Sequence, residues 1–532
     1  MIFHRSRRLF FVSSILLLIH RFLVSDIRRV SAFAISSSGP NNQHHHTSFS
    51  TPRRSRAVTT TPPTTIHHKH RGNVTPATTT TLLNSSTNDS NSMDTRGGGG
   101  GGGATKGTAK NVIVGKAEST NNNNNKKMRI VAFDSIRFIL CTMIVLGHFI
   151  MFANPNTFWL KFFSQHNTVP VSAFFLLGGY VSAYTSTEQG IAEPSAKLVN
   201  TPKPQWILSR IFGYYPLHLV TLILFSPMFI YTSLKYSGPW TTVWHGFLSA
   251  TLTQAWFPMT AEVWNAPTWY LSALTFATAI MPYALPYVAK QNKEQLRKTA
   301  FWLWLVVALP KFAYCHDLNV WRLPEGITSP KAHPNMALFN TQRFSPLYMV
   351  SEILLGAVAC RLVMLDGATP VDDKDKKLSS LPKVNALSTL VPLTALLGVM
   401  SIRAAGLIEV NDLLTRAIVV VPLVLRLFMS VHRVTVQGVN DPFTSLLNNK
   451  VLLWLGNLAF PIYIVHGPIG QVFYKRAIAT QLWGKVLKGP EFFALYLGVT
   501  GFSAFLLQKL FLQNKAVQSF SKKTVDKLAS WM

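Results

Sequence analysis

The stretch RFILCTMIVLGH, residues 137–148, places an arginine and a histidine eleven positions apart in an otherwise apolar segment. Eleven residues of an α-helix turn through about 1100°, which is three turns plus about 20°, so Arg137 and His148 share one face. They are separated by about 16 Å along the helix axis. Asp134 and Cys141 belong to the same stripe. The stretch therefore predicts a helix with an acid, a cation and an imidazole along one side.

Apolar runs of this kind recur from about residue 128 to residue 512. The chain of 532 residues is 48% hydrophobic and only 14% charged, whereas about a quarter of the residues of a soluble protein are charged. A run of about 20 residues is long enough to cross a hydrocarbon core of roughly 30 Å. The fold class that we expect is all-α, a polytopic helical membrane protein.

The apolar segments predict about ten transmembrane helices and possibly eleven. The weakest segment, 242–258, contains His245 and Gln254. If it only dips into the membrane, ten spans remain, most basic loops share one side, and both ends face the cytosol or its equivalent. The segments lie near 130–152, 168–185, 206–232, 242–258, 267–289, 299–315, 343–365, 386–404, 412–431, 450–472 and 491–512.

The formal net charge of +30 does not indicate a nucleic-acid partner. Residues 1–128 carry 17 Lys and Arg against 4 Asp and Glu, and much of the remaining charge lies in short loops between apolar segments. In such loops basic residues orient the helices by the positive-inside rule. The three cysteines lie in or at the ends of apolar segments without metal-ligand or CxxC spacing, so no disulfide framework and no metal site are predicted.

The chain divides into four parts by composition. Residues 1–35 have a basic start and an apolar core, typical of a signal or targeting segment. Residues 36–127 are of low complexity and are expected to be disordered. Residues 128–515 form the membrane domain, and 516–532 form a basic tail. The SAFA sequence at residues 31–34 is similar to the motif of complex-plastid presequences, and an ordinary secretory signal for the endoplasmic reticulum is the alternative.

An ionisable side chain inside a membrane span is costly and by default indicates a functional site. A histidine exchanges protons near neutral pH, as acyl transfer to a hydroxyl requires, and an arginine suits an anion such as phosphate. The alternative is structural, with Asp134 and Arg137 paired at the interface and His148 bonded to a neighbouring helix. The complete stripe favours function.

FDSIRFILCTMIVLGHF, residues 133–149, resembles the opening helix of the acyltransferase-3 family of integral-membrane acyltransferases. Asp134, Arg137 and His148 match the polar positions of that helix. Further similar stretches follow in order: VSAFFLLGGY (171–180), SRIFGYYP (209–216), TWYLSALTF (268–276), SEILLGA (351–357) and LGNLAFPIYIVHGPI (455–469). The resemblance spans about residues 129–512, and its first helix is the most specific part.

The chain also departs from the family pattern. An arginine of the family's Arg-x-x-Arg pair is replaced by Gly213, which leaves Arg210. A serine is replaced by Gly178 and a glutamate by Leu274. In the last motif the serine and tyrosine are Ala459 and Phe460. A specialised enzyme and a catalytically degenerate family member are both compatible with these departures.

The resemblance implies an O-acyltransferase that moves an acyl group, often acetyl, from acyl-CoA to a hydroxyl of a glycan, sugar or lipid acceptor. It implies His148 and Asp134 as catalytic residues. It implies substrate contacts for Arg137 and Arg210, on the phosphates of the donor, and for His466, Trp269 and Ser272. Acyl-CoA is then a co-substrate, and no cofactor is expected. A polytopic transporter is the main alternative from another class, although no internal repeat is present. A structural membrane protein would have no need of His148.

Overall fold

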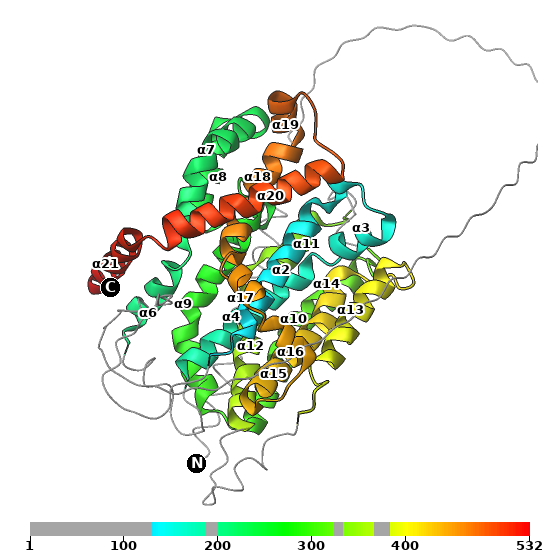
Figure 1. Ribbon diagram of the computed structural model, residues 1–532, viewed down its shortest axis with the longest axis vertical. Helices are drawn as coiled ribbons and strands as arrows, with labels where there is room; N and C mark the ends of the chain where they lie inside the picture. The colour runs from blue at the N-terminus through cyan, green and yellow to red at the C-terminus, as the bar shows by residue number, and fades with distance from the viewer. Residues whose placement is uncertain (1–128, 188–200, 324–332, 367–383) are drawn as a thin grey trace, which may run out of the picture. The chain divides into compact units, whose positions relative to one another are not determined.

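The computed structural model describes residues 129–187, 201–323, 333–366 and 384–532, which fold into helices (Figure 1). The first half contains α2 (Ala132–Phe149), η1 (Ile150–Ala153), α3 (Thr157–Ser164), α4 (Thr168–Ser186), α6 (Lys203–Ile211), α7 (Tyr215–Ser237), α8 (Pro239–Thr251), η2 (Gln254–Trp256), η3 (Pro258–Thr260), η4 (Ala266–Thr268), α9 (Trp269–Lys290) and α10 (Lys293–Asp317). The second half contains α11 (Met336–Phe344), α12 (Pro346–Asp366), α13 (Leu390–Ala404), α14 (Asp412–Thr415), the π-helical η6 (Arg416–Val420), α15 (Val421–Gln437), α16 (Pro442–Leu447), α17 (Lys450–Gly456), α18 (Ala459–Tyr474), α19 (Arg476–Trp483), α20 (Pro490–Leu507), the π-helical η7 (Gln508–Leu512) and α21 (Lys515–Trp531).

The predicted helical class is confirmed, since every predicted apolar segment lies largely within helix. The tail at 516–532 forms most of α21. The predicted targeting segment, residues 1–35, and the predicted disordered region, residues 36–127, lie outside the described residues.

The number of membrane spans differs from the expected ten. Among the described residues, six helices are long and apolar enough to cross a membrane, and a seventh is added if the bent pair α17 and α18 counts as one span. Ten spans are therefore not shown. A run of apolar residues does not show where a helix ends. In the predicted segment 242–258 the α-helix ends at Thr251, and in the segment 386–404 the helix α13 has only 15 residues, so neither counts as a span.

Side-chain caps explain where several of the helices begin. The side chain of Asn292 accepts a hydrogen bond from the backbone of Gln295, whose own side chain bonds back to the Asn292 N–H, so α10 opens with a complete capping box. These contacts satisfy N–H groups that have no partner in the first turn of a helix. Equivalent asparagine or aspartate caps open α3, α11, α14, α16, α17 and α21.

α4 and α12 approach each other so closely in the core that only glycine fits at two positions. A Cβ atom on Gly179 would lie 1.7 Å from the carbonyl oxygen of Ile353, and one on Gly356 would lie 1.9 Å from that of Leu176. Small residues allow this backbone contact, which is a usual basis of helix association in membranes. α2, the helix with the predicted catalytic residues, packs on α4 and also on α17 and α18.

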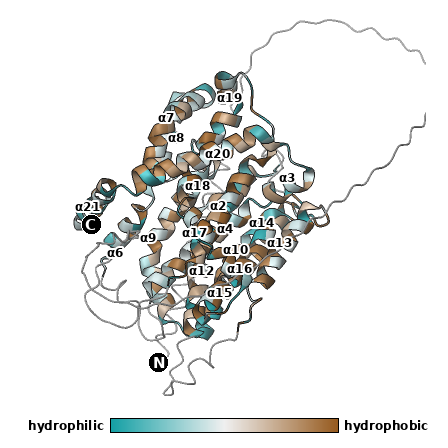
Figure 2. Cartoon of the chain, viewed as in Figure 1, coloured by the Kyte–Doolittle hydropathy of each residue, from teal (hydrophilic) through white to brown (hydrophobic). Residues whose placement is uncertain are grey.

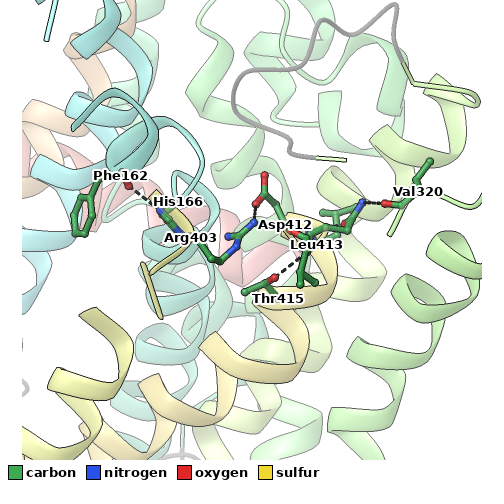
Figure 3. Close-up of polar contacts among 9 residues, drawn as sticks. Phe162, His166, Val320, Arg403, Asp412, Leu413 and Thr415 are labelled. Carbon is green, nitrogen blue, oxygen red and sulfur yellow. Dashed lines mark hydrogen bonds and ion pairs between the residues drawn. The ribbon is translucent and has the colours of Figure 1, made fainter. Parts of the chain in front are cut away.

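A buried ion pair links the end of α13 to the start of α14, as Figure 3 shows. Arg403 donates hydrogen bonds to the Asp412 carboxylate and to the carbonyl of Val410, the latter at 2.7 Å. Nearby, His166 bonds to the carbonyl of Phe162 at 2.8 Å. Burial, together with the charge of Arg403, lowers the pKa of His166 to about 4. The histidine is therefore neutral at physiological pH, and the buried arginine is balanced by its aspartate.

Large apolar side chains remain exposed on the outer helices, whose ribbons contain many hydrophobic residues, coloured brown in Figure 2. In water so large an apolar area would promote association, whereas in a bilayer it contacts lipid. These side chains include Ile223 and Leu224 on α7, Trp240 and Val243 on α8, and Phe502 on α20.

Replacing Gly179 by alanine should separate α4 from α12, because the new methyl group would overlap the Ile353 carbonyl. Overpacking of this kind costs about 1–3 kcal/mol or more, and here the obstacle is rigid backbone. We expect a lower melting temperature in detergent and loss of the monodisperse size-exclusion peak. Gly178→Ala is the matched control, since a Cβ on Gly178 meets no atom within 4 Å. Equal behaviour of the two variants would contradict the close-packing account.

Candidate active site

His148 and His466 meet through a hydrogen bond inside the helical bundle. His148 lies in the last turn of α2, and His466 lies in the middle of α18 and is fully buried. The Nδ1 atom of His148 is 3.0 Å from Nε2 of His466, and the two ring planes differ by only 8°. Two histidines that are 318 positions apart in the sequence therefore form one unit.

The hydrogen bonds of His466 determine which nitrogen of each neutral ring carries a proton. Nδ1 of His466 is 2.7 Å from the carbonyl oxygen of Tyr463, which can only accept, so this nitrogen donates. Nε2 of a neutral His466 must then accept from Nδ1–H of His148. This leaves Nε2 of His148 with a free lone pair, so the pair presents a proton acceptor in a fixed orientation.

α18 is held in register by hydrogen bonds to the segment before α9. The Tyr463 hydroxyl donates to the carbonyl of Pro267, and the Asn265 amide donates to the carbonyl of Ile464 at 2.9 Å. Gln471 donates to the carbonyl of Trp264 at 2.8 Å. Trp264 has a positive φ of 54°, which a non-glycine residue rarely adopts and which the surrounding contacts must maintain. These bonds fix the backbone carbonyl that orients His466.

α2 fits against α18 at the bend between α17 and α18, which is 57°. The thiol of Cys141 donates to the carbonyl of Ala459 at 3.1 Å, close to this bend. Cys141 lies two turns before His148 on the same stripe of α2. Its contact with α18 therefore also fixes the position of His148 along the helix axis relative to His466.

Asp134 and Arg137 form an ion pair at the opposite end of α2. Their closest oxygen and nitrogen atoms are 2.5 Å apart, and Arg129 also bonds to Asp134, at 2.6 Å. The Arg137 side chain is 38% exposed, so its guanidinium remains accessible. Eleven residues of helix separate Arg137 from His148 by about 16 Å. The predicted stripe is therefore present along α2, but the Asp134–Arg137 ion pair and His148 belong to two separate sites.

Arg210 lies at the same end of the bundle as Arg137. Its guanidinium contacts the hydroxyl groups of Thr185 and Ser186 at 3.3 and 3.5 Å, at the end of α4, and stacks 4.5 Å from the Trp206 ring. The start of α2 lies beside this end of α4, since α2 and α4 are in contact there. Arg137 and Arg210 therefore lie at the same end of the helical bundle.

Trp269 and Ser272 are placed differently from the histidine pair. Trp269 is buried against the rings of Phe344 and Phe175, with ring centroids 4.9 and 6.4 Å apart. The Ser272 hydroxyl accepts a hydrogen bond from the backbone N–H of Ala255 at 3.2 Å. Both contacts belong to the packing of α9.

Arg343 is a charged residue that was not predicted from the sequence. It lies in the last turn of α11, with its guanidinium 4.4 Å from the centroid of the Phe344 ring. Its guanidinium is 3.5 Å from the carboxylate of Glu262. Its position at the start of a predicted span was an available signal, of the same kind that identified Arg137.

A cavity of about 460 Å³ lies beside the histidine pair. Phe149 lines it, and the Phe149 ring also contacts the rings of both His148 and His466, with centroids 6.1 and 6.3 Å apart. Aromatic rings and polar side chains both line the cavity. Such a lining suits a ligand that contains a ring and hydroxyl groups. The polar side chains are Thr232, Ser233, Ser237, His245, Glu262, Gln471 and Lys475, and the aromatic ones include Phe152, Phe229, Tyr236, Trp264 and Tyr474.

Comparison with known proteins identifies the family of the chain. The acyltransferase domain that defines the acyltransferase 3 family matches residues 130–508, which is most of the chain and includes both histidines. Acyltransferase MdmB of Streptomyces mycarofaciens is 23% identical over 302 residues, which are 56% of this chain and 67% of that protein. No solved structure matches the chain. The protein is thus a multi-pass membrane acyltransferase that belongs to the acyltransferase 3 family.

Proposed function

We propose that the protein is an O-acyltransferase that transfers an acyl group, acetyl in particular, from acyl-CoA to a hydroxyl group of a glycan, sugar or lipid. The observation that carries this proposal is the His148–His466 hydrogen bond, because it leaves one imidazole nitrogen of His148 free to accept a proton. Abstraction of the acceptor's proton by a positioned base is the step that such a transfer requires.

In the proposed reaction Nε2 of His148 accepts the proton of the acceptor hydroxyl while the hydroxyl oxygen attacks the thioester carbonyl. The new C–O bond forms, the C–S bond breaks, and the proton passes from His148 to the departing thiolate to give free coenzyme A. His466 is a positioning residue in this scheme. Its Nε2 accepts a hydrogen bond from Nδ1–H of His148 and thereby holds the tautomer and the ring orientation of His148.

The donor is proposed to enter at the face that carries Arg137 and Arg210. Arginine binds phosphate through several charge-assisted hydrogen bonds, and coenzyme A presents phosphates at one end and its thioester at the other. The separation of about 16 Å between Arg137 and His148 along α2 suits a ligand extended in this way. Asp134 bonds to Arg137, so we assign it the role of orienting that guanidinium rather than a direct part in proton transfer.

Substitution of His148 by alanine should reduce acyl transfer by about 10²–10⁴-fold, the usual contribution of a general base. The variant should insert and purify like the wild type, because His148 is one polar residue at the end of α2. The assay is incubation of purified protein in native-lipid nanodiscs with labelled acetyl-CoA and longer acyl-CoAs, followed by recovery of label in the lipid or glycan fraction. A folded His148→Ala protein with normal transfer would refute the catalytic assignment.

His466→Ala should lower kcat by about 10–100-fold, the scale typical of residues that orient a primary group, and should leave the KM of the donor nearly unchanged. His466→Gln should recover part of this loss, since its side-chain oxygen can accept the Nδ1–H bond of His148. A purely structural role would give no such recovery, and Gln and Ala variants of equal activity would exclude the positioning role.

Arg137→Ala or Arg210→Ala should raise the KM of acyl-CoA about ten- to hundredfold, which corresponds to loss of a charge-assisted hydrogen bond of about 1.5–3 kcal/mol. The KM of the acceptor should change little. Lys203→Gln is a matched control, because Lys203 is a cation on the same helix as Arg210 whose ammonium lies over the Tyr283 ring. Equal changes in the KM of both substrates would contradict a donor site.

The cavity beside Phe149 is proposed to admit the acceptor. Ser237→Trp would place a large ring in it, so the KM of the acceptor should rise at least tenfold while the KM of acyl-CoA stays constant. Leu224→Trp serves as the control, since Leu224 is on the same helix, is 64% exposed and lies outside the cavity lining. An unchanged acceptor KM in the Ser237 variant would show that the acceptor enters elsewhere.

A further inference from the structure

The last helix of the chain, α21, has one apolar and one basic face. Phe520 and Trp531 are eleven residues apart and therefore lie within about 20° of each other around the helix. The basic face contains Lys515, Lys522 and Lys523, and Lys527 lies at the boundary with its ammonium 5.1 Å from the Trp531 ring. The helix holds one acidic residue, Asp526.

Only part of the apolar face is covered by the protein. α21 packs against α6, as Figure 1 shows, with Val525 buried and the Gln205 amide 3.2 Å from the Asp526 carboxylate. Phe520 and Trp531 are each 70% exposed. Two large aromatic side chains thus lie beside lysines, and none of the residues that the structure describes covers them.

The position of α21 in the chain indicates what covers these rings. The segment Pro490–Leu512 is a candidate membrane span, and only 17% of its apolar window is buried inside the protein. α21 begins at Lys515, and the Asn514 side chain caps its first turn. The helix therefore starts where the chain leaves the bilayer. Its neighbour α6 carries Arg210, at the end of the bundle where Arg137 also lies.

We infer that α21 lies on the surface of an anionic lipid leaflet, with Phe520 and Trp531 inserted among the acyl chains and the lysines over the headgroups. Amphipathic helices with aromatic residues on one face and lysines on the other bind membranes in this orientation. Basic residues gather on the cytosolic side of membrane proteins, where anionic lipids are enriched. This inference goes beyond the acyl-transfer proposal and does not depend on it.

The test uses the full chain in vesicles of neutral phosphatidylcholine alone or with 30% phosphatidylserine. Phe520→Cys and Ser519→Cys proteins are labelled with a polarity-sensitive fluorophore. Ser519 is the matched control, since it is exposed and about 100° away from Phe520 on the helix. The three native cysteines are buried, and unsubstituted protein gives the background label.

We expect the label at position 520 to be quenched by a lipid-borne quencher, to be protected from aqueous iodide, and to depend on phosphatidylserine. The label at position 519 should stay accessible to iodide. Each lysine near an anionic surface favours binding by about fivefold, so Lys522→Gln with Lys523→Gln should weaken the phosphatidylserine dependence roughly twentyfold. Both positions are exposed, so these variants should elute like the wild type.

Equal iodide access at positions 519 and 520 in both vesicle types would overturn the inference. So would protection of position 520 without quenching from the lipid, because a protein surface would then cover the aromatic rings. Protection induced by coenzyme A in neutral vesicles would assign the lysines to an anionic substrate instead, and would equally overturn it.

Discussion

A polar group inside an apolar helical bundle must find its partner within the protein, because lipid offers none. The ion pair between Arg416 and Glu352 illustrates this constraint at its strongest. Both side chains are fully buried, their closest atoms are 2.8 Å apart, and Arg416 also donates to the hydroxyl of Ser172. Removing one member of such a pair typically costs about 3–5 kcal/mol, since the other charge remains buried alone. These contacts join η6, α12 and α4 into one core.

The same constraint gives the candidate active site its form. At the bend between α17 and α18 the thiol of Cys141 donates a hydrogen bond to the Ala459 carbonyl. Further along α18, the Ile464 carbonyl accepts a hydrogen bond from the Asn265 amide, which lies before α9. His466 satisfies its own ring by bonding to the carbonyl of Tyr463. Only its second nitrogen is then left for His148. The hydrogen bonds within α18 thus orient the imidazole of His148 on α2.

The two ends of α2 have different chemistry because a rigid helix separates them. At one end, Arg137 is balanced by Asp134 and remains partly exposed, while at the other the ring of His148 stacks on that of His466 and contacts that of Phe149. α4 packs closely on α12 through Gly179 and Gly356, and α4 also contacts α2. In the proposed reaction, the separation lets a charged donor and a hydroxyl acceptor bind at different ends of α2.

The sequence by itself determined the helical class and the family. It also determined that Asp134, Arg137 and His148 form one stripe, because spacing along one helix follows from helix geometry alone. Only the tertiary structure decided that His466 is the partner of His148 and that, among the described residues, six or seven helices qualify as spans. These features join residues that are distant in the chain or depend on where a helix bends. The hydropathy of a segment carries no information about either, because helix packing arises from contacts between segments.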